Sequence, residues 1–101
     1  MKAKVEFNDS LAIIVLDGQL DYSSQDDIHD AINTALASTS AKEIQVDLYA
    51  VTFMDSAIIQ ALLTLRKKAL KVDKLLTLIR CPDTLREVFT IGGFDGVFTI
   101  K

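Results

Sequence analysis

The chain has 101 residues, of which half are apolar and a quarter charged, with a formal net charge of −3. This size fits one domain with one hydrophobic core. The acidic balance and the dispersed basic residues argue against nucleic-acid binding, and one cysteine and one histidine exclude an internal disulfide and a Cys/His zinc site.

The first residues, MKAKVEFNDS, alternate apolar and polar side chains and predict a half-buried strand. They lack the continuous apolar run of a signal peptide, and no run in the chain approaches the roughly 20 residues that cross a bilayer. We therefore expect a cytoplasmic protein without direct membrane insertion. Residues 11–16 are continuously apolar and predict a second strand, which pairs with the first as a hairpin through the turn at 8–10.

A polar loop is expected over residues 18–24, followed by a helix. Ser24 and Asp27 match a capping box with aspartate in the acid position, and apolar residues follow at helical spacing. Residues 38–40, Ser-Thr-Ser, end this helix. The alternation over 44–48 then predicts a third strand.

A central helix is predicted to begin near Asp55 or Ser56 and to run to about Lys71. The first N–H groups of a helix lack intrahelical partners, and Asp or Ser side chains accept from them, so capping explains this pair. A phosphate on Ser56 would meet the same N–H groups and the positive end of the helix dipole. The position therefore suits both a helix cap and a phosphorylation switch, and periodicity leaves the two open.

The apolar arc of this helix is wider than a surface helix needs. Ile58 belongs to one apolar stripe, and Ile59, Leu63 and Leu70 form a second stripe beside it. Two interpretations remain: a deep groove against the sheet buries both stripes, or the second stripe contacts a protein partner.

The last third of the chain predicts a buried strand over 74–80, a third helix and a short final strand over 97–100. Pro82 is suited to the first position of that helix, and the glycines at 92–93 to its end. The predicted order is ββαβαβαβ. Strands that alternate with helices imply a parallel or mixed sheet covered by helices.

Residues 46–65, VDLYAVTFMDSAIIQALLTL, resemble the signature of STAS domains, a family named for sulfate transporters and anti-sigma-factor antagonists. The family pattern is a strand, an apolar turn and Asp-Ser-Ser-Gly-Leu-Gly at a helix start. Residues 16–32 are similar to its Gly-x-Leu-Asp turn and first helix, and residues 85–100 to its closing helix, loop and strand. The resemblance implies a single α/β domain over residues 1–101, with a four- to five-stranded mixed sheet flanked by helices.

For stand-alone bacterial members the resemblance implies a role in transcription regulation. Such proteins bind an anti-sigma factor that is also a serine kinase, and the sigma factor is released. The kinase phosphorylates the serine after the motif's aspartate, which corresponds to Ser56 after Asp55, and a serine phosphatase resets the cycle. The chain would then be a substrate and not an enzyme, and it would need no cofactor of its own because the kinase supplies ATP and magnesium.

The chain departs from the family pattern directly after Ser56, where Ala-Ile-Ile-Gln at 57–60 replaces Ser-Gly-Leu-Gly. Both glycines are lost, so a partner that approaches the bare backbone would meet side chains. Either the partner has a pocket for Ile58 and Ile59, or the domain is a non-phosphorylated STAS module. Examples of such a module are a subunit of a lipid-transport ABC complex and a stressosome-type scaffold; a binder of small ligands or nucleotides is a third interpretation.

The expected partner surface joins the start of the central helix to the loop before the first helix. Family resemblance brings that loop near the phosphorylation site, whereas an ordinary capped loop is the alternative. The expected partner-binding residues are Asp21, Tyr22, Asp55, Ser56, Ala57, Ile58, Ile59 and Leu63.

Overall fold

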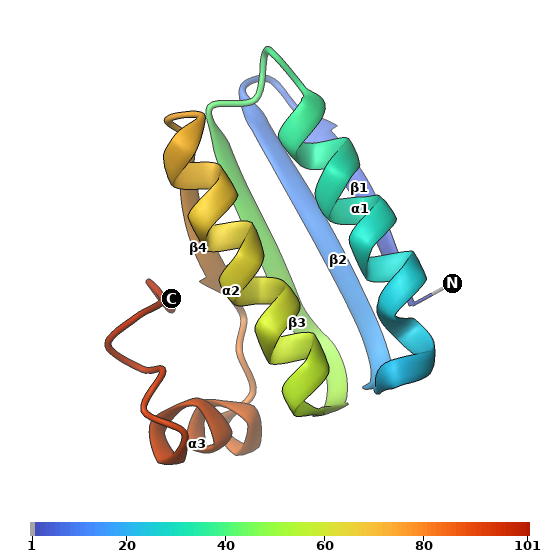
Figure 1. Cartoon of the computed structure of the whole chain (residues 1–101), viewed down its shortest axis with the longest axis vertical. Helices are drawn as coiled ribbons and strands as arrows, with labels where there is room; N and C mark the ends of the chain where they lie inside the picture. Colours follow the sequence, from blue (N-terminus) through green and yellow to red (C-terminus); the bar gives the residue numbers. More distant parts are fainter. Residues whose placement is uncertain (1) are drawn as a thin grey trace.

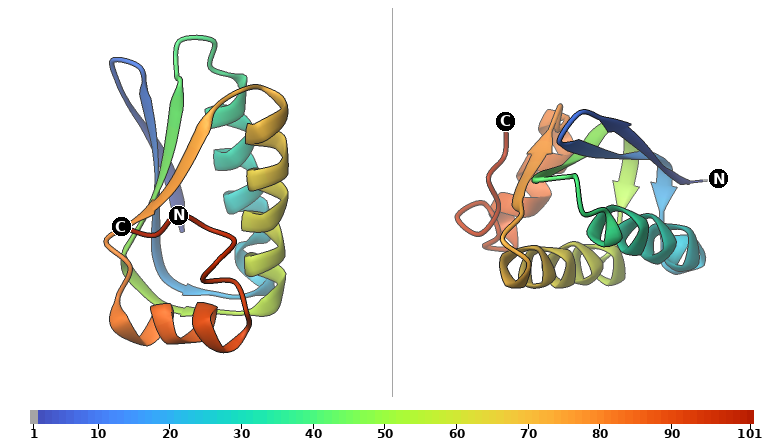
Figure 2. Two further views of the ribbon diagram at one scale, coloured as in Figure 1. Left: turned by 90° about the vertical axis from the view of Figure 1, so that its left-hand side faces the viewer. Right: turned by 90° about the horizontal axis from the view of Figure 1, so that it is seen from above.

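A computed structural model describes residues 2–101 as a mixed four-stranded sheet with two helices on one face and a third beyond one end of its strands (Figures 1 and 2). The sheet order is β1-β2-β3-β4, and the mixed α/β sheet that was predicted is confirmed. The elements are β1 (Ala3–Asn8), β2 (Leu11–Leu20), η1 (Tyr22–Ser24), α1 (Gln25–Ala37), β3 (Glu43–Met54), α2 (Ser56–Lys71), β4 (Leu75–Ile79) and α3 (Asp83–Ile91).

Strand directions follow from the connections. β1 and β2 form the predicted antiparallel hairpin, whereas the α1 and α2 crossovers make β2, β3 and β4 parallel. The hairpin turn includes Asp9, whose φ of 54° is a conformation that aspartate tolerates better than most residues. Carboxyl ends of the three parallel strands therefore lie at the same end of the sheet.

The core lies between the sheet and the helices α1 and α2, which run side by side across one face (Figure 2). Alternate residues of β2 and β3 point into it, as the period of two requires. The largest fully buried side chains are Phe89, Ile14, Leu16, Leu20, Ile28, Ile44, Leu48, Ile58, Leu62, Leu65, Leu78 and Val46. Within residues 2–101, no helix has both the length and the apolar character needed to cross a membrane.

The end of α3 confirms the predicted stop at the two glycines. Gly93 has a φ of 80°, which suits a residue without a Cβ. Its N–H donates to the Thr90 carbonyl at 3.1 Å, and the Phe94 N–H donates to the Phe89 carbonyl at 2.7 Å, which is the Schellman pattern. The predicted start was off by one residue, because extended Pro82 precedes the helix and Asp83 is its first residue.

Two further predictions about local structure were wrong. β2 continues to Leu20 through the segment predicted as a polar loop, with register shifts against β3 on either side of a Gly18 whose φ is 82°. The predicted capping box does not form: Ser24 makes no side-chain cap bond, and its hydroxyl is buried within the turn η1. Asp21 caps that turn instead, so the chain enters α1 through a 3-10 turn.

The predicted final strand is reduced to one parallel bridge between Leu78 and Ile100. The Leu78 N–H donates to the Thr99 carbonyl, and the Lys101 N–H donates to the Leu78 carbonyl, both at 2.8 Å. Just before the bridge, the chain turns away toward α2. β4 is consequently an edge strand, and Leu75 is 70% exposed, whereas the sequence suggested a buried strand.

Candidate functional site

The carboxyl ends of β2 and β3 bring together the two predicted loops. Leu20 pairs with Met54 at the last step of the parallel ladder, and the Asp55 N–H donates to the Leu20 carbonyl at 3.0 Å. The segment after β2 therefore lies beside the start of α2, although about 30 residues separate them in sequence. This end of the sheet is where parallel α/β folds place their binding sites.

The structure assigns the capping role to Asp55. Its backbone is extended, with a φ of −89° and a ψ of 176°, and its Oδ1 accepts from the Ile58 N–H at 3.1 Å. Ser56 is then the first residue of α2 and is exposed. Because Asp55 supplies the cap, the Ser56 side chain is not needed for capping. It lies on the surface at the positive end of the helix dipole.

The loop beside this helix start is ordered by Asp21. Its Oδ1 accepts from the Ser23 N–H at 3.0 Å and from the Ser23 hydroxyl. The hydroxyl hydrogen bond is the main reason that the pKa of Asp21 lies below its usual range. Tyr22, between them, is 76% exposed and presents an aromatic ring to solvent.

The central-helix residues of the predicted set divide into two groups. Ala57 is half-buried, and Leu63 is half-buried against the core. Ile58 is fully buried and Ile59 is 7% exposed, because the first turn of α2 packs directly on the sheet. Ile58 and Ile59 are thus core residues in this structure, and of the second apolar stripe only Leu70 is largely exposed. Of the two interpretations of the second stripe, burial in a deep groove against the sheet therefore holds for Ile59.

One feature of this end of the molecule was missed in the sequence. A hollow of about 150 Å³ lies between the end of β3 and α3, lined by Phe53, Met54 and Val88 among others. Phe53 is exposed two residues before Asp55. Alternation along β3 does not predict which face of the sheet Phe53 lies on, because the register of β3 against β2 shifts before this residue. Exposed aromatic side chains therefore come from both segments of the site.

An ion pair lies away from this site, on the sheet face that carries no helix. The Arg80 guanidinium donates to both carboxylate oxygens of Asp47, at 2.6 Å from Nη2, and lies 4.7 Å over the Tyr49 ring. Burial alone raises the pKa of Asp47, but the hydrogen bonds from Arg80 and from the Tyr49 N–H outweigh it and hold the pKa below its usual range. The ionised carboxylate is therefore the stabilising form.

This ion pair predicts a pH dependence of unfolding. A carboxyl with a lowered pKa in the folded state stabilises the fold above its unfolded value of about 3.9, and the contribution is lost as the pH falls through the folded value. We expect Asp47→Asn to cost about 1 kcal/mol at pH 7, since 58% of the Arg80 side chain is exposed, and less at pH 3. Urea unfolding at both pH values measures this. Asp95→Asn, at an exposed aspartate, is the control. If Asp47→Asn lowered the free energy of unfolding equally at both pH values, the ionised Asp47 carboxylate would not be the stabilising form.

The other reactive side chains do not form a site. His29 is exposed on α1. Cys81 is half-buried, and burial raises the pKa of its thiol, which disfavours the thiolate. Among residues 2–101, no group of three or more His, Cys, Asp or Glu side chains is placed to hold a metal ion.

Comparison with known proteins agrees with this fold. A family model described as "Mlab, STAS domain" matches residues 3–100. A STAS-domain-containing protein of Pseudomonas aeruginosa is 28% identical over 88 residues, which are 87% of this chain and 85% of that protein.

Solved structures of anti-sigma-factor antagonists have the same fold. SpoIIAA of Bacillus in its unphosphorylated form has a TM-score of 0.80 and 23% identity, over 98% of this chain and 87% of that one. An anti-sigma-factor antagonist from Mycobacterium paratuberculosis has a TM-score of 0.85 and 22% identity, over 97% and 82% of the two chains. At these identities the likeness concerns the fold alone. The match over residues 3–100 shows that the chain belongs to the STAS domain family.

Proposed function

We propose that this chain is an anti-sigma-factor antagonist that works by binding a partner protein, in a cycle controlled by phosphorylation of Ser56. The observation that carries the proposal is the exposed Ser56 at the first position of α2, next to an aspartate that supplies the cap. The structural likeness to anti-sigma-factor antagonists, including SpoIIAA in its phosphorylated form, supports it.

The proposed partner is an anti-sigma factor with serine-kinase activity, and a serine phosphatase would reverse the modification. The partner would dock where the two loops meet, over Asp21, Tyr22, Asp55, Ser56 and Ala57. The exposed Tyr22 ring suits such a contact, because aromatic side chains often dominate the binding energy of interfaces. In this proposal the chain catalyses nothing itself.

The helix start explains why a phosphate on Ser56 would be compatible with the fold. The first N–H groups of α2 point toward that position, and the dipole of the helix favours negative charge there. The added charge of about −1.5 to −2 would stand beside the carboxylates of Asp55 and Asp21. We therefore expect phosphorylation to change the surface that the partner meets while leaving the core intact.

The loss of both family glycines favours a second candidate function, that of a non-phosphorylated STAS module. In the structure the substituted residues at 57–60 do not all face a partner, because Ile58 and Ile59 are buried. Ile58 replaces the first family glycine and Ile59 replaces a leucine, so these two changes affect the core more than the docking face. Gln60, in place of the second glycine, is exposed. That placement makes the substitutions compatible with the first function.

Phosphate transfer to the purified chain decides between the two. The chain is incubated with Mg²⁺, ATP and a candidate anti-sigma factor with serine-kinase activity, and intact-mass spectrometry is combined with peptide mapping. We expect one added phosphate, located on Ser56, and none on a Ser56→Ala variant. Modification of Ser56→Ala to the same extent would exclude Ser56 as the acceptor, and stable complex formation without any modification would favour the non-phosphorylated module.

A further inference from the structure

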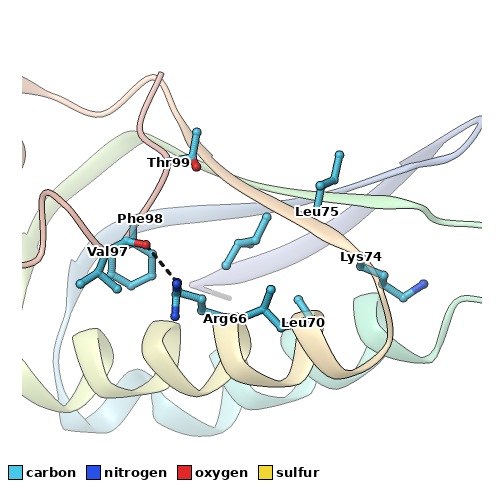
Figure 3. Close-up of a pocket in the computed structure, with 9 residues that line it drawn as sticks. Arg66, Leu70, Lys74, Leu75, Val97, Phe98 and Thr99 are labelled. Carbon is cyan, nitrogen blue, oxygen red and sulfur yellow. Dashed lines mark hydrogen bonds between the residues drawn. The ribbon is translucent and has the colours of Figure 1, made fainter.

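A groove of about 210 Å³ lies between the second half of α2, the start of β4 and the last residues of the chain (Figure 3). It is on the flank of the molecule, apart from the loops around Ser56. Most of its lining is apolar and comes from Ala69, Leu70, Leu75, Leu76, Val97 and Phe98. Leu70 is 61% exposed and Leu75 is 70% exposed, so the apolar surface continues outside the groove.

The groove occupies a place where a fifth strand would otherwise continue. Ile100 bridges Leu78 in parallel, and the same register would set Phe98 opposite Leu76. Instead the chain turns toward α2, where the Val97 carbonyl accepts from Arg66 Nε at 3.0 Å, as the dashed line in Figure 3 shows. The Phe98 ring is buried against Phe89. The groove therefore lies beside the first half of β4, where the end of the chain does not pair with this strand.

The outer edge of β4 has backbone groups in this groove that can form hydrogen bonds with another strand. The Leu75 N–H donates to the Lys42 carbonyl, on the side of β3. The Leu78 N–H donates to the Thr99 carbonyl, on the outer side of the sheet. Because N–H directions alternate along a strand, the Leu76 N–H and carbonyl also face outward. Within residues 2–101, this edge pairs with the chain end at Leu78 and through the Arg80 N–H, which donates to the Lys101 carbonyl at 3.1 Å, and the pairing does not extend to Leu76. Such an edge is a template for an added strand.

The charge around the groove indicates what kind of strand would fit. Arg66 lines it, and the exposed Lys67 and Lys71 follow on α2. Lys74 also lines the groove, but its ammonium group donates to the Ser38 and Ala41 carbonyls. Lys67 lies three residues before Leu70 and is therefore its neighbour on the helix surface. The chain as a whole carries a net charge of −3, so this cationic rim is a local feature. It is complementary to an acidic segment.

From this combination we infer that the groove is a second protein-docking site, which takes an extended acidic segment of a partner as a strand added to β4. Backbone pairing at Leu76 supplies the register. The side chains at every second position of the segment face α2. Some of these are apolar and cover Leu70 and Leu76, and the others are carboxylates that meet the cations of α2. The inference goes beyond the proposed function and does not require that Ser56 is phosphorylated.

The test is an NMR titration of the ¹⁵N-labelled chain with a ten-residue synthetic peptide. Threonine, a strand-forming residue, stands at every second position, and valine and glutamate take turns at the others, so that both can face α2. We expect saturable shifts of the amide signals of residues 74–78 and 97–101, and slower hydrogen exchange of the Leu76 amide. Binding should weaken with added salt. A peptide with lysine in place of glutamate should not bind.

Two variants locate the site. Leu70→Glu places a negative charge on the apolar rim and should weaken peptide binding at least about tenfold. Phe7→Glu is the matched control, since Phe7 is 52% exposed on β1, at the opposite edge of the sheet, and binding should be unchanged. Ser56→Asp should also leave peptide binding unchanged, which separates this inference from the proposed function.

Several results would overturn the inference. The first is a flat titration, and the second is a response confined to residues near Ser56. An equal response to octanoate, which has no peptide backbone to pair, would assign the groove to a small amphiphile. Shifts of the same signals on concentrating the chain alone would assign it to a second copy.

Discussion

Ser56→Asp is expected to weaken binding of the kinase partner by about 30-fold or more while the fold stays intact. An unpaired charge at the centre of a protein interface costs on the order of 2 kcal/mol or more, which is about a 30-fold loss of affinity. The same carboxylate at the first position of α2 meets the positive end of the helix dipole, so stability should be unchanged or slightly higher. Calorimetric titration with the partner and urea unfolding measure the two effects.

Thr64→Asp is the matched control for this experiment. Thr64 is exposed on the same helix, two turns farther along, and the substitution adds the same charge away from the proposed docking surface. Its partner affinity should stay within about twofold of the unmodified chain, which corresponds to a few tenths of a kcal/mol. If Ser56→Asp bound as tightly as Thr64→Asp, the switch at Ser56 would be excluded and the constitutive module preferred.

Phe89→Ala is expected to have the largest effect on stability. The ring is fully buried, and its centroid lies 5.7 Å from that of Phe98 at an interplanar angle of 60°, a tilted aromatic pair. Truncation of a buried phenylalanine costs roughly 3–5 kcal/mol, a large part of the 5–15 kcal/mol that is typical for a domain. Urea unfolding followed by circular dichroism gives the change in the free energy of unfolding.

The neighbouring Val88→Ala provides the comparison. Val88 is exposed on the same turn of α3, so its truncation removes little buried surface and should cost under about 1 kcal/mol. Because Phe98 packs on Phe89, amide exchange in residues 97–101 should also accelerate in Phe89→Ala. Similar costs for the two substitutions would mean that α3 contributes little to the core.

Local patterns were sufficient where neighbours in the sequence decide the structure. The start of α2 at Asp55 and Ser56, its end near Lys71 and the glycine stop of α3 were all predicted, because caps and left-handed turns depend on residues within one helical turn. The hairpin of β1 and β2 followed from a short turn between an alternating segment and a continuous apolar run. The STAS resemblance rests on the same local segments, and the family match confirms it.

Contacts between distant segments decided the rest. Burial of Ile58 and Ile59, exposure of Leu75 and the meeting of Asp47 with Arg80 each depend on partners tens of residues away. Helical spacing assigns Ile59 to an apolar stripe but cannot say how deeply the stripe sinks against the sheet. The final strand is reduced to a bridge because Arg66, 31 residues before Val97, binds its carbonyl. Residue types and spacing determine which elements form and where they end, whereas exposure and pairing are set by packing in three dimensions.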